Sequence, residues 1–262
     1  MLTEWLKSSP LIIGHRGYCS RFPENTLSSF NAAIKAGAQM IELDVTFSKD
    51  RRLMVIHDET LDRTTNGTGQ IQHHTYQELK QLDAGSWFSE MFSGEKIPDL
   101  EEVFDMVQQN CLINVEIKPE AFEISDGTQT IEQMVIQLIE KYNLEESIII
   151  SSFEHRLFHR IQHRAPYLRL GLLHDPEIHP EMTKLCQHYP VHSCHPDART
   201  LRAEDITSLH EQGLKVCPYT VNNEEEMKKL LSWGVDGIFT DDPVRLLQVI
   251  GGYSSEPLSS SA

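Results

Sequence analysis

Short runs rich in β-branched and aliphatic residues recur along the chain, and stretches with helical spacing separate most of them. Leu27, Phe30 and Ile34, for example, share one face of a helix that we expect to follow Asn25 as N-cap and to stop at Gly37. Repeated strand–helix units favour a parallel sheet covered by helices. The predicted strands span residues 11–14, 40–47, 53–57, 112–118, 148–152, 169–173, 191–195, 215–221 and 237–240.

Two of these strands, 40–47 and 53–57, lie too close in sequence to be parallel neighbours. A parallel crossover needs roughly a dozen residues, so these two are predicted to form an antiparallel hairpin around residues 48–51. Without the return strand, eight strands remain, which is the number in a (β/α)8 TIM-type barrel of typical length. We therefore expect one α/β barrel domain over residues 10–250.

The segment 60–96 interrupts the strand–helix alternation and is too long for a plain loop. We expect a small insertion here, after the second barrel strand and its hairpin, lying over one end of the barrel. Its residues Phe88, Met91 and Phe92 either pack the insertion onto the barrel or line an apolar pocket. Residues 251–262 are predicted to be a flexible C-terminal tail.

The composition narrows the range of partners and locations. The chain has 262 residues and a formal charge of −16, a balance that disfavours nucleic acid or an anionic membrane surface. It has no run of 18 apolar residues, its first ten residues lack the apolar core of a signal peptide, and its five cysteines form no C-x-x-C pair. We expect a cytoplasmic protein with reduced thiols and no stable membrane anchor. A homodimer is left open.

Ionisable residues gather where the predicted strands end, which is where barrel enzymes place their active sites. The first strand runs into His15 and Arg16. The second carries Glu42 and Asp44, which are two apart and so face the same way. A later strand carries Glu116 and Lys118 with the same spacing.

The hairpin decides whether His57 joins this group. A two-residue turn near residues 49–51 sets His57 across from Glu42 or Asp44, on the same face, whereas a three-residue turn sets it on the opposite face. We expect the two-residue register.

These residue types suggest phosphate chemistry, although each alone has an ordinary structural explanation. Ionised carboxylates do not cluster without a cation, and three of them (Glu42, Asp44 and Glu116) suit Mg²⁺ or Ca²⁺ better than zinc. A lone histidine is more often structural, but two beside a metal site suit a general acid and base. Arg16 and Lys118 supply the positive charge that binds a phosphate.

Motifs in a fixed order add a resemblance to a known family. They are "HRG" at 15–17, "PENT" at 23–26, "ELDV" at 42–45, "HD" at 57–58, "LDRTTNGTG" at 61–69, "GSWFS" at 85–89, "EIK" at 116–118, "YTVN" at 219–222 and "DGIFTDDP" at 236–243. Over residues 12–249 the chain resembles the glycerophosphodiester phosphodiesterase family. The resemblance implies a TIM-type barrel that hydrolyses glycerophosphodiesters to sn-glycerol 3-phosphate and an alcohol with the help of a divalent metal ion.

By this resemblance, each candidate residue acquires a role. Glu42, Asp44 and Glu116 correspond to metal ligands, and His15 and His57 to the acid–base pair. Arg16 and Lys118 correspond to phosphate contacts. The chain departs from the family twice: Asp50-Arg51 stands where members often have Asp-Gly, and Tyr219 stands where many carry Trp. Tyr219 keeps an aromatic wall, and we place it among the substrate-binding residues.

Several alternatives stay open. The same barrel suits a lysophospholipase D that cleaves acylated substrates, or a non-catalytic barrel that binds a ligand. The nucleophile is either water or the neighbouring glycerol hydroxyl, which would give a cyclic phosphate. The stretch "CQHYPVHSCH" at 186–195 has no zinc-binding spacing and is predicted to be a strand with two buried thiols, from which His195 could reach the rim of the site.

Overall fold

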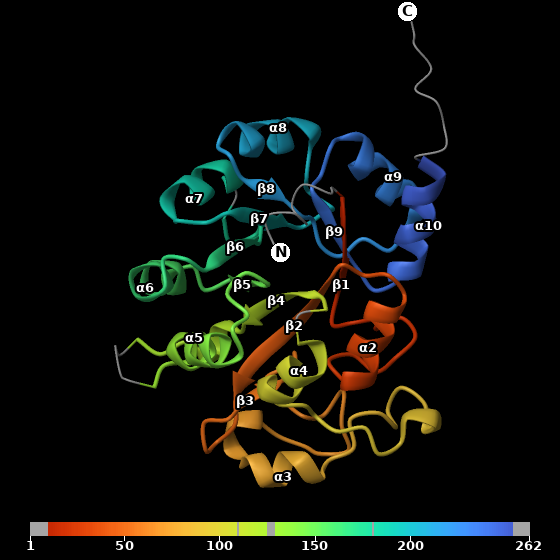
Figure 1. Ribbon diagram of the computed structural model, residues 1–262, viewed down its shortest axis with the longest axis vertical. Helices are drawn as coiled ribbons and strands as arrows, with labels where there is room; N and C mark the ends of the chain where they lie inside the picture. The colour runs from red at the N-terminus through yellow and green to blue at the C-terminus, as the bar shows by residue number, and fades with distance from the viewer. Residues whose placement is uncertain (1–9, 109, 125–128, 180, 254–262) are drawn as a thin grey trace, which may run out of the picture.

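A ring of eight parallel strands forms the centre of the molecule in the computed structural model, which describes residues 10–108, 110–124, 129–179 and 181–253 (Figure 1). The strands lie in the order β8-β7-β6-β5-β4-β2-β1-β9, and β3 pairs antiparallel with β2 outside this path. Backbone hydrogen bonds from Asp236 to Val216 (2.8 Å) and from Phe239 to Pro218 (3.0 Å) join the two ends of the order. The predicted (β/α)8 barrel is therefore confirmed.

The strands agree closely with the predicted runs. They are β1 (Leu11–Gly14), β2 (Met40–Phe47), β3 (Leu53–Val55), β4 (Leu112–Ile117), β5 (Ile148–Ser152), β6 (Arg169–His174), β7 (Ser193–Pro196), β8 (Lys215–Val216) and β9 (Gly237–Thr240). The largest difference is β8, which ends at Val216 because Pro218 has no N–H for a ladder.

Helices surround the ring (Figure 1). They are α2 (Leu27–Lys35), α3 (Tyr76–Gln81), α4 (Leu100–Val107), α5 (Ile131–Tyr142), α6 (Arg156–Arg164), α7 (Met182–His188), α8 (Ala203–Glu211), α9 (Glu224–Ser232) and α10 (Pro243–Tyr253), with short 3₁₀ turns at Ile71–His73, Glu90–Phe92 and Pro119–Ala121. The N-cap of α2 is Thr26 and not the predicted Asn25, whose backbone is left-handed (φ 55°).

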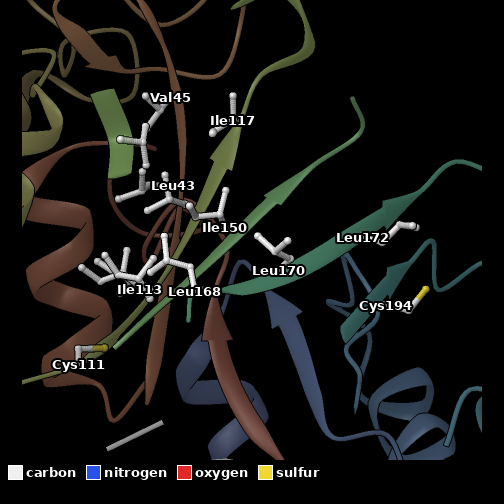
Figure 2. Packing of buried hydrophobic residues seen from close by; sticks show 14 of the residues in the cluster. Leu43, Val45, Cys111, Ile113, Ile117, Ile150, Leu168, Leu170, Leu172 and Cys194 are labelled. Atoms are coloured by element: carbon white, nitrogen blue, oxygen red, sulfur yellow. The ribbon is translucent and has the colours of Figure 1, made fainter. Parts of the chain in front are cut away.

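Alternation along the strands separates an apolar outer face from a polar inner face. Leu43, Val45, Ile113 and Ile117 belong to one hydrophobic cluster (Figure 2). The same cluster contains helix residues such as Phe104. The residues between them face the barrel interior, where the register sets Met40 beside Leu112, Glu42 beside Asn114 and Asp44 beside Glu116. The interior therefore changes from apolar to charged toward the carboxyl ends of the strands.

The hairpin of β2 and β3 has a different register from the one we expected. Five residues, 48–52, connect Phe47 to its partner Leu53, and the Ile56 N–H donates to the Asp44 carbonyl (3.0 Å). Ile56, and not His57, thus lies across from Asp44, so the predicted two-residue turn is wrong. Because β3 ends at Val55, the chain turns at Ile56–Asp58, and this turn brings His57 to the site described below.

Residues 60–96 form a separate small unit beside β3, α2 and α4 rather than across the centre of the ring in this view (Figure 1). A small hydrophobic cluster joins it to the β3 hairpin: Leu61, Ile71, Leu79 and Ala84 of the segment pack with Met54, Ile56 and Ile97 beside it. Phe92 packs on Phe22 of the loop after β1 (ring centroids 5.3 Å apart), whereas Met91 is 84% exposed.

The two ends of the chain lie largely outside the described residues. Helix α10 continues to Tyr253, so the first three residues of the predicted tail are helical, and 254–262 are outside the described part. Among the described residues, none of the helices has the length and hydropathy needed to cross a bilayer.

Candidate active site

A cavity of about 230 Å³ opens among the carboxyl ends of the barrel strands. Most of the predicted site residues line it, and Asp44 and Lys118 contact those that do. Its lining is His15, Arg16, Glu42, His57, Asn114, Glu116, Phe153, Leu173, Tyr219, Thr220 and Phe239.

Three buried carboxylates meet at one side of the cavity. Glu42, Asp44 and Glu116 each offer an oxygen, and these oxygens lie within 4.8 Å of one another. Burial, with the charges of Asp44 and Glu116, raises the pKa of Glu42 well above its usual value. Burial also acts to raise the pKa of Asp44, but Lys118 and Arg16 outweigh it and hold that pKa below its usual value.

This donor set fits a hard divalent cation. All the donors are carboxylate oxygens, and Oδ1 of Asp44 is buried and makes no hydrogen bond, with the Lys118 ammonium at the longer distance of 3.4 Å. Burial raises the pKa of Glu116 as well, despite the ion pair with Lys118. A divalent ion would supply the charge that lets all three groups ionise together.

Arg16 and Lys118 lie beside these carboxylates with their charges intact. The Arg16 backbone N–H donates to Glu42 (2.7 Å), and its guanidinium donates to Glu24 (2.8 Å). The Arg16 backbone is left-handed (φ 51°), and Gly17 follows at φ 88°, where an added Cβ would collide with Ser29. This turn explains why "HRG" contains a glycine.

Lys118 Nζ lies 3.0 Å from Glu116 and 3.4 Å from Asp44. Burial acts to lower its pKa, but these two carboxylates outweigh burial, so the net pKa is raised and the ammonium stays charged.

His57 is held by a chain of charged groups that begins in the inserted segment. Its Nδ1 donates to Asp58 (2.7 Å), and Arg63 donates to both oxygens of Asp58 and to both oxygens of Glu24. Burial lowers the pKa of His57, and the nearby cations Lys118 and Arg16 add to this effect. The imidazole is therefore neutral at pH 7.

His15 has a carboxylate partner in the residue that follows the last barrel strand, β9. Its Nδ1 donates to Oδ1 of Asp241 at 2.7 Å, and its backbone N–H donates to Thr240 (3.0 Å). Both histidines are thus fixed through Nδ1, and each keeps Nε2 for other contacts.

Aromatic and aliphatic side chains form the opposite wall of the cavity. Tyr219 stacks edge-on against Phe153 (centroids 6.0 Å apart), and its hydroxyl donates to the carbonyl of His174 (2.9 Å). The substrate-binding role of Tyr219 remains a prediction, but its ring forms the aromatic wall that we expected.

The stretch 186–195 does not contribute to this cavity. Cys186 lies on helix α7 and Cys194 on β7, so the prediction of one strand with two thiols is wrong, although both thiols are buried. His195 is buried inside the barrel against Phe239, and burial lowers its pKa to about 3. It does not reach the rim.

Comparisons with known proteins agree with this geometry. The model of the "Glycerophosphoryl diester phosphodiesterase family" matches residues 15–245. A glycerophosphodiester phosphodiesterase of Caldanaerobacter subterraneus is 42% identical over 241 residues, which cover 92% of this chain and 97% of the relative. One from Bacillus altitudinis is 39% identical over 91% of this chain and 97% of its own length.

The chain belongs to the glycerophosphoryl diester phosphodiesterase family. It is therefore an enzyme, a phosphoric diester hydrolase. A phosphodiesterase of Oleispira antarctica, solved in complex with the product sn-glycerol-3-phosphate, is 30% identical, with a TM-score of 0.83 over 92% of this chain and 97% of that one.

Within this family site, the structure adds residues that sequence reasoning did not single out. Glu24, Arg63 and Asp241 lie in quoted motifs, but nothing in the spacing of these motifs shows which side chains they contact. Asn114 was easier to predict from the sequence, because it is two residues before Glu116 and so faces the same way along the strand. Its Oδ1 is buried without a hydrogen-bond partner.

Proposed function

We propose that this enzyme hydrolyses glycerophosphodiesters to sn-glycerol 3-phosphate and an alcohol, using Mg²⁺ or Ca²⁺ and His15 and His57 as its acid–base pair. The observation that carries the proposal is that three carboxylates, two histidines and two cationic side chains meet in one place, most of them lining one cavity and Asp44 and Lys118 in contact with those that do. A cavity of about 230 Å³ suits a small headgroup substrate.

The charged groups divide the work of binding. Glu42, Asp44 and Glu116 would hold the divalent ion, which when bound polarises phosphoryl oxygens and stabilises the charge that develops on them. Arg16 and Lys118 bind the remaining phosphoryl oxygens through charge-assisted hydrogen bonds. The Nε of Arg16 makes no hydrogen bond and lies 3.5 Å from Oδ2 of Asp44.

The two histidines move the protons. One imidazole takes the proton of the attacking hydroxyl as its oxygen bonds to phosphorus, and the other gives a proton to the alkoxide that leaves when the second P–O bond breaks. His57, which is neutral at pH 7, is in the form that accepts a proton. The attacking group is water or the adjacent glycerol hydroxyl. In the second route water then opens the cyclic phosphate.

The test is a substrate panel under metal control. Purified enzyme is assayed on glycerophosphocholine, glycerophosphoethanolamine, glycerophosphoglycerol and glycerophosphoinositol with Mg²⁺, Ca²⁺ or excess chelator, and ³¹P NMR identifies the products. We expect sn-glycerol 3-phosphate from at least one substrate, and its formation should stop with chelator. Hydrolysis of lysophospholipids alone would replace this proposal with the lysophospholipase D activity.

Our proposal also includes the cytoplasm as the location, where such substrates arise in lipid and glycerol metabolism. Fractionation of the native cells tests this part: we expect the protein in the cytoplasmic fraction, and recovery with membranes would contradict it.

A further inference from the structure

The two histidines of the site have carboxylate partners at equal distances but with different surroundings. Both Nδ1···Oδ1 distances are 2.7 Å. Arg63 binds both oxygens of Asp58, so the charge of that carboxylate is shared with a guanidinium. The other side-chain partners of Asp241 are uncharged: the thiol of Cys19 donates to Oδ1 (3.0 Å) and the amide of Asn222 to Oδ2 (2.6 Å).

These contacts keep Asp241 ionised and at the same time hold it still. Burial opposes its ionisation, but hydrogen bonds from His15, Cys19 and Asn222 lower its pKa to about 2. Burial and the Asp241 charge raise the pKa of the Cys19 thiol, so the thiol is protonated and acts as a donor. An ionised carboxylate can only accept, so the proton between His15 and Asp241 lies on Nδ1.

Asn222 holds Asp241 in place through three hydrogen bonds. While its Nδ2 donates to the Asp241 side chain, its Oδ1 accepts from the Asp241 backbone N–H (2.9 Å) and from the Thr240 hydroxyl (3.2 Å). The amide thus fixes both the backbone and the side chain of Asp241. These contacts give the motifs "YTVN" and "DGIFTDDP" a shared structural role, although neither contributes a metal ligand or one of the two proposed acid–base histidines.

We propose that Asp241, held by Asn222, is a positioning residue that fixes the tautomer and the orientation of His15, so that Nε2 is the nitrogen available for proton transfer. The proposal rests on the function proposed above for His15. If the His15 ring turned away, Nε2 would no longer point at the reacting atoms, whether it donates or accepts the proton. If the neutral ring carried its proton on Nε2, that nitrogen could not accept one. Asp241 acts only through His15 and needs no contact with the substrate.

Asp241→Asn is the direct test, because the amide preserves size while removing the charge. We expect kcat to fall roughly 10²–10⁴-fold with little change in KM, the range by which a positioned acid or base contributes. The matched control is Asp242→Asn, since the neighbouring Asp242 accepts from the Arg245 backbone N–H (3.1 Å) and not from His15. Asparagine also caps helices well, so this control should keep wild-type kcat.

A double-mutant cycle separates positioning from direct catalysis. In a His15→Asn background, Asp241→Asn should lower kcat by less than about twofold, because the partner through which it acts is gone. A full additional loss in that background would overturn the proposal, as would wild-type kcat in the single variant. Thermal melts of each variant show whether any loss reflects unfolding.

Long-range ¹⁵N NMR on histidine-labelled protein tests the same idea without turnover. We expect His15 to carry its proton on Nδ1 in the wild type and to lose this preference in Asp241→Asn, with the His15→Asn spectrum assigning the signal. A neutral wild-type His15 that carries its proton on Nε2 and not on Nδ1 overturns the inference. If the wild type hydrolyses no glycerophosphodiester, the proposed function fails, and the NMR result still decides the positioning of His15.

Discussion

Burial gives chemically similar residues of the cavity different behaviour. Glu42 and Asp44 are both carboxylic acids on β2, two residues apart and almost completely buried. Lys118 and Arg16 hold the pKa of Asp44 below its usual value, whereas burial and two like charges raise the pKa of Glu42. The cationic side chains therefore do not fully compensate the three carboxylates, and a bound cation would complete this compensation.

The two histidines lead to the first prediction. Replacing His15 or His57 with Asn should lower kcat on natural substrates by about 10²–10⁴-fold and leave the melting temperature nearly unchanged, because each ring is partly exposed and serves the reaction. On a nitrophenyl phosphodiester, whose leaving group needs no protonation, the variant that lacks the acid should regain much of its rate. Since His57 is neutral, we expect this recovery for His15→Asn.

Kinetics on both substrates, with melts alongside, check this assignment. Recovery in His57→Asn instead would reverse the two roles. Near-wild-type kcat in both variants on glycerophosphocholine and glycerophosphoethanolamine would remove the histidines from the mechanism.

Single residues also show how far sequence reasoning reaches. Glu42, Asp44, Glu116 and Lys118 were predictable together because strand alternation and the barrel's active-site rule place them at one end of the interior. Asp241 was not, since its contact with His15 spans 226 positions and depends on barrel closure. Alternation within one strand gives no information on such contacts.

At the scale of elements, the β2–β3 hairpin shows why local register is hard to predict. Arg51 adopts a left-handed backbone (φ 61°) at the position where the family often has glycine. Its guanidinium lies over the Phe47 ring (4.2 Å) and donates to both oxygens of Glu123 (3.1 and 2.7 Å). These contacts, which no turn rule contains, stabilise a five-residue connection and with it the observed pairing.

The second prediction follows from that backbone. Arg51→Ala keeps the left-handed strain and loses the contacts, whereas Arg51→Gly loses the contacts but relieves the strain. We expect Arg51→Gly to be more stable than Arg51→Ala by about 1 kcal/mol in urea unfolding. Equal stabilities would show that residue 51 is not left-handed in solution.

The third prediction concerns the segment 60–96. Because its small cluster is separate from the main core, we expect a chain with this segment replaced by a short loop to keep its barrel, as measured by circular dichroism and a cooperative melt. Its kcat should fall, since Arg63 no longer holds Asp58 and Glu24, and its preference among alcohols should change. Failure to fold would make the segment part of the barrel core.

The same replacement has a point-mutant control. Arg63→Ala removes the link to Asp58 and Glu24 but leaves the rest of the segment in place. It should reproduce the loss in kcat without the change in preference. A point variant with wild-type kcat would show that the bonds of Arg63 do not support His57.

At the scale of the whole molecule, the polarity of the barrel interior changes from one end to the other. One end is filled by apolar side chains such as Leu11, Met40 and Leu112, and the other end gathers like charges. The apolar layers supply the folding free energy that allows the protein to keep three carboxylates in a poorly hydrated place. The stability of the folded protein should therefore depend on whether protons or a cation neutralise these carboxylates.

The last prediction tests this dependence by pH and metal together. Because the pKa of Glu42 is raised in the folded state, the folded protein holds a proton that the unfolded chain releases near pH 4.5. The contribution of Glu42 to stability is then present below that pH and is lost as pH rises toward the folded-state pKa. Metal-free enzyme should melt progressively lower as the pH rises above the unfolded-state value, and Mg²⁺ or Ca²⁺ at 100 times its Kd should raise Tm at pH 8 by about 5–10 °C.

Glu42→Gln is the matched control, since it keeps the shape of the side chain and removes one charge. Its metal-free form should lose less stability above pH 5 than the wild type, and the cation should stabilise it much less. Asp50→Asn, a change on the exposed hairpin turn, should behave like the wild type toward the cation. If neither ion shifts the wild-type melt, or if Glu42→Gln shows the same shift, these carboxylates do not form the metal site, whatever the enzyme hydrolyses.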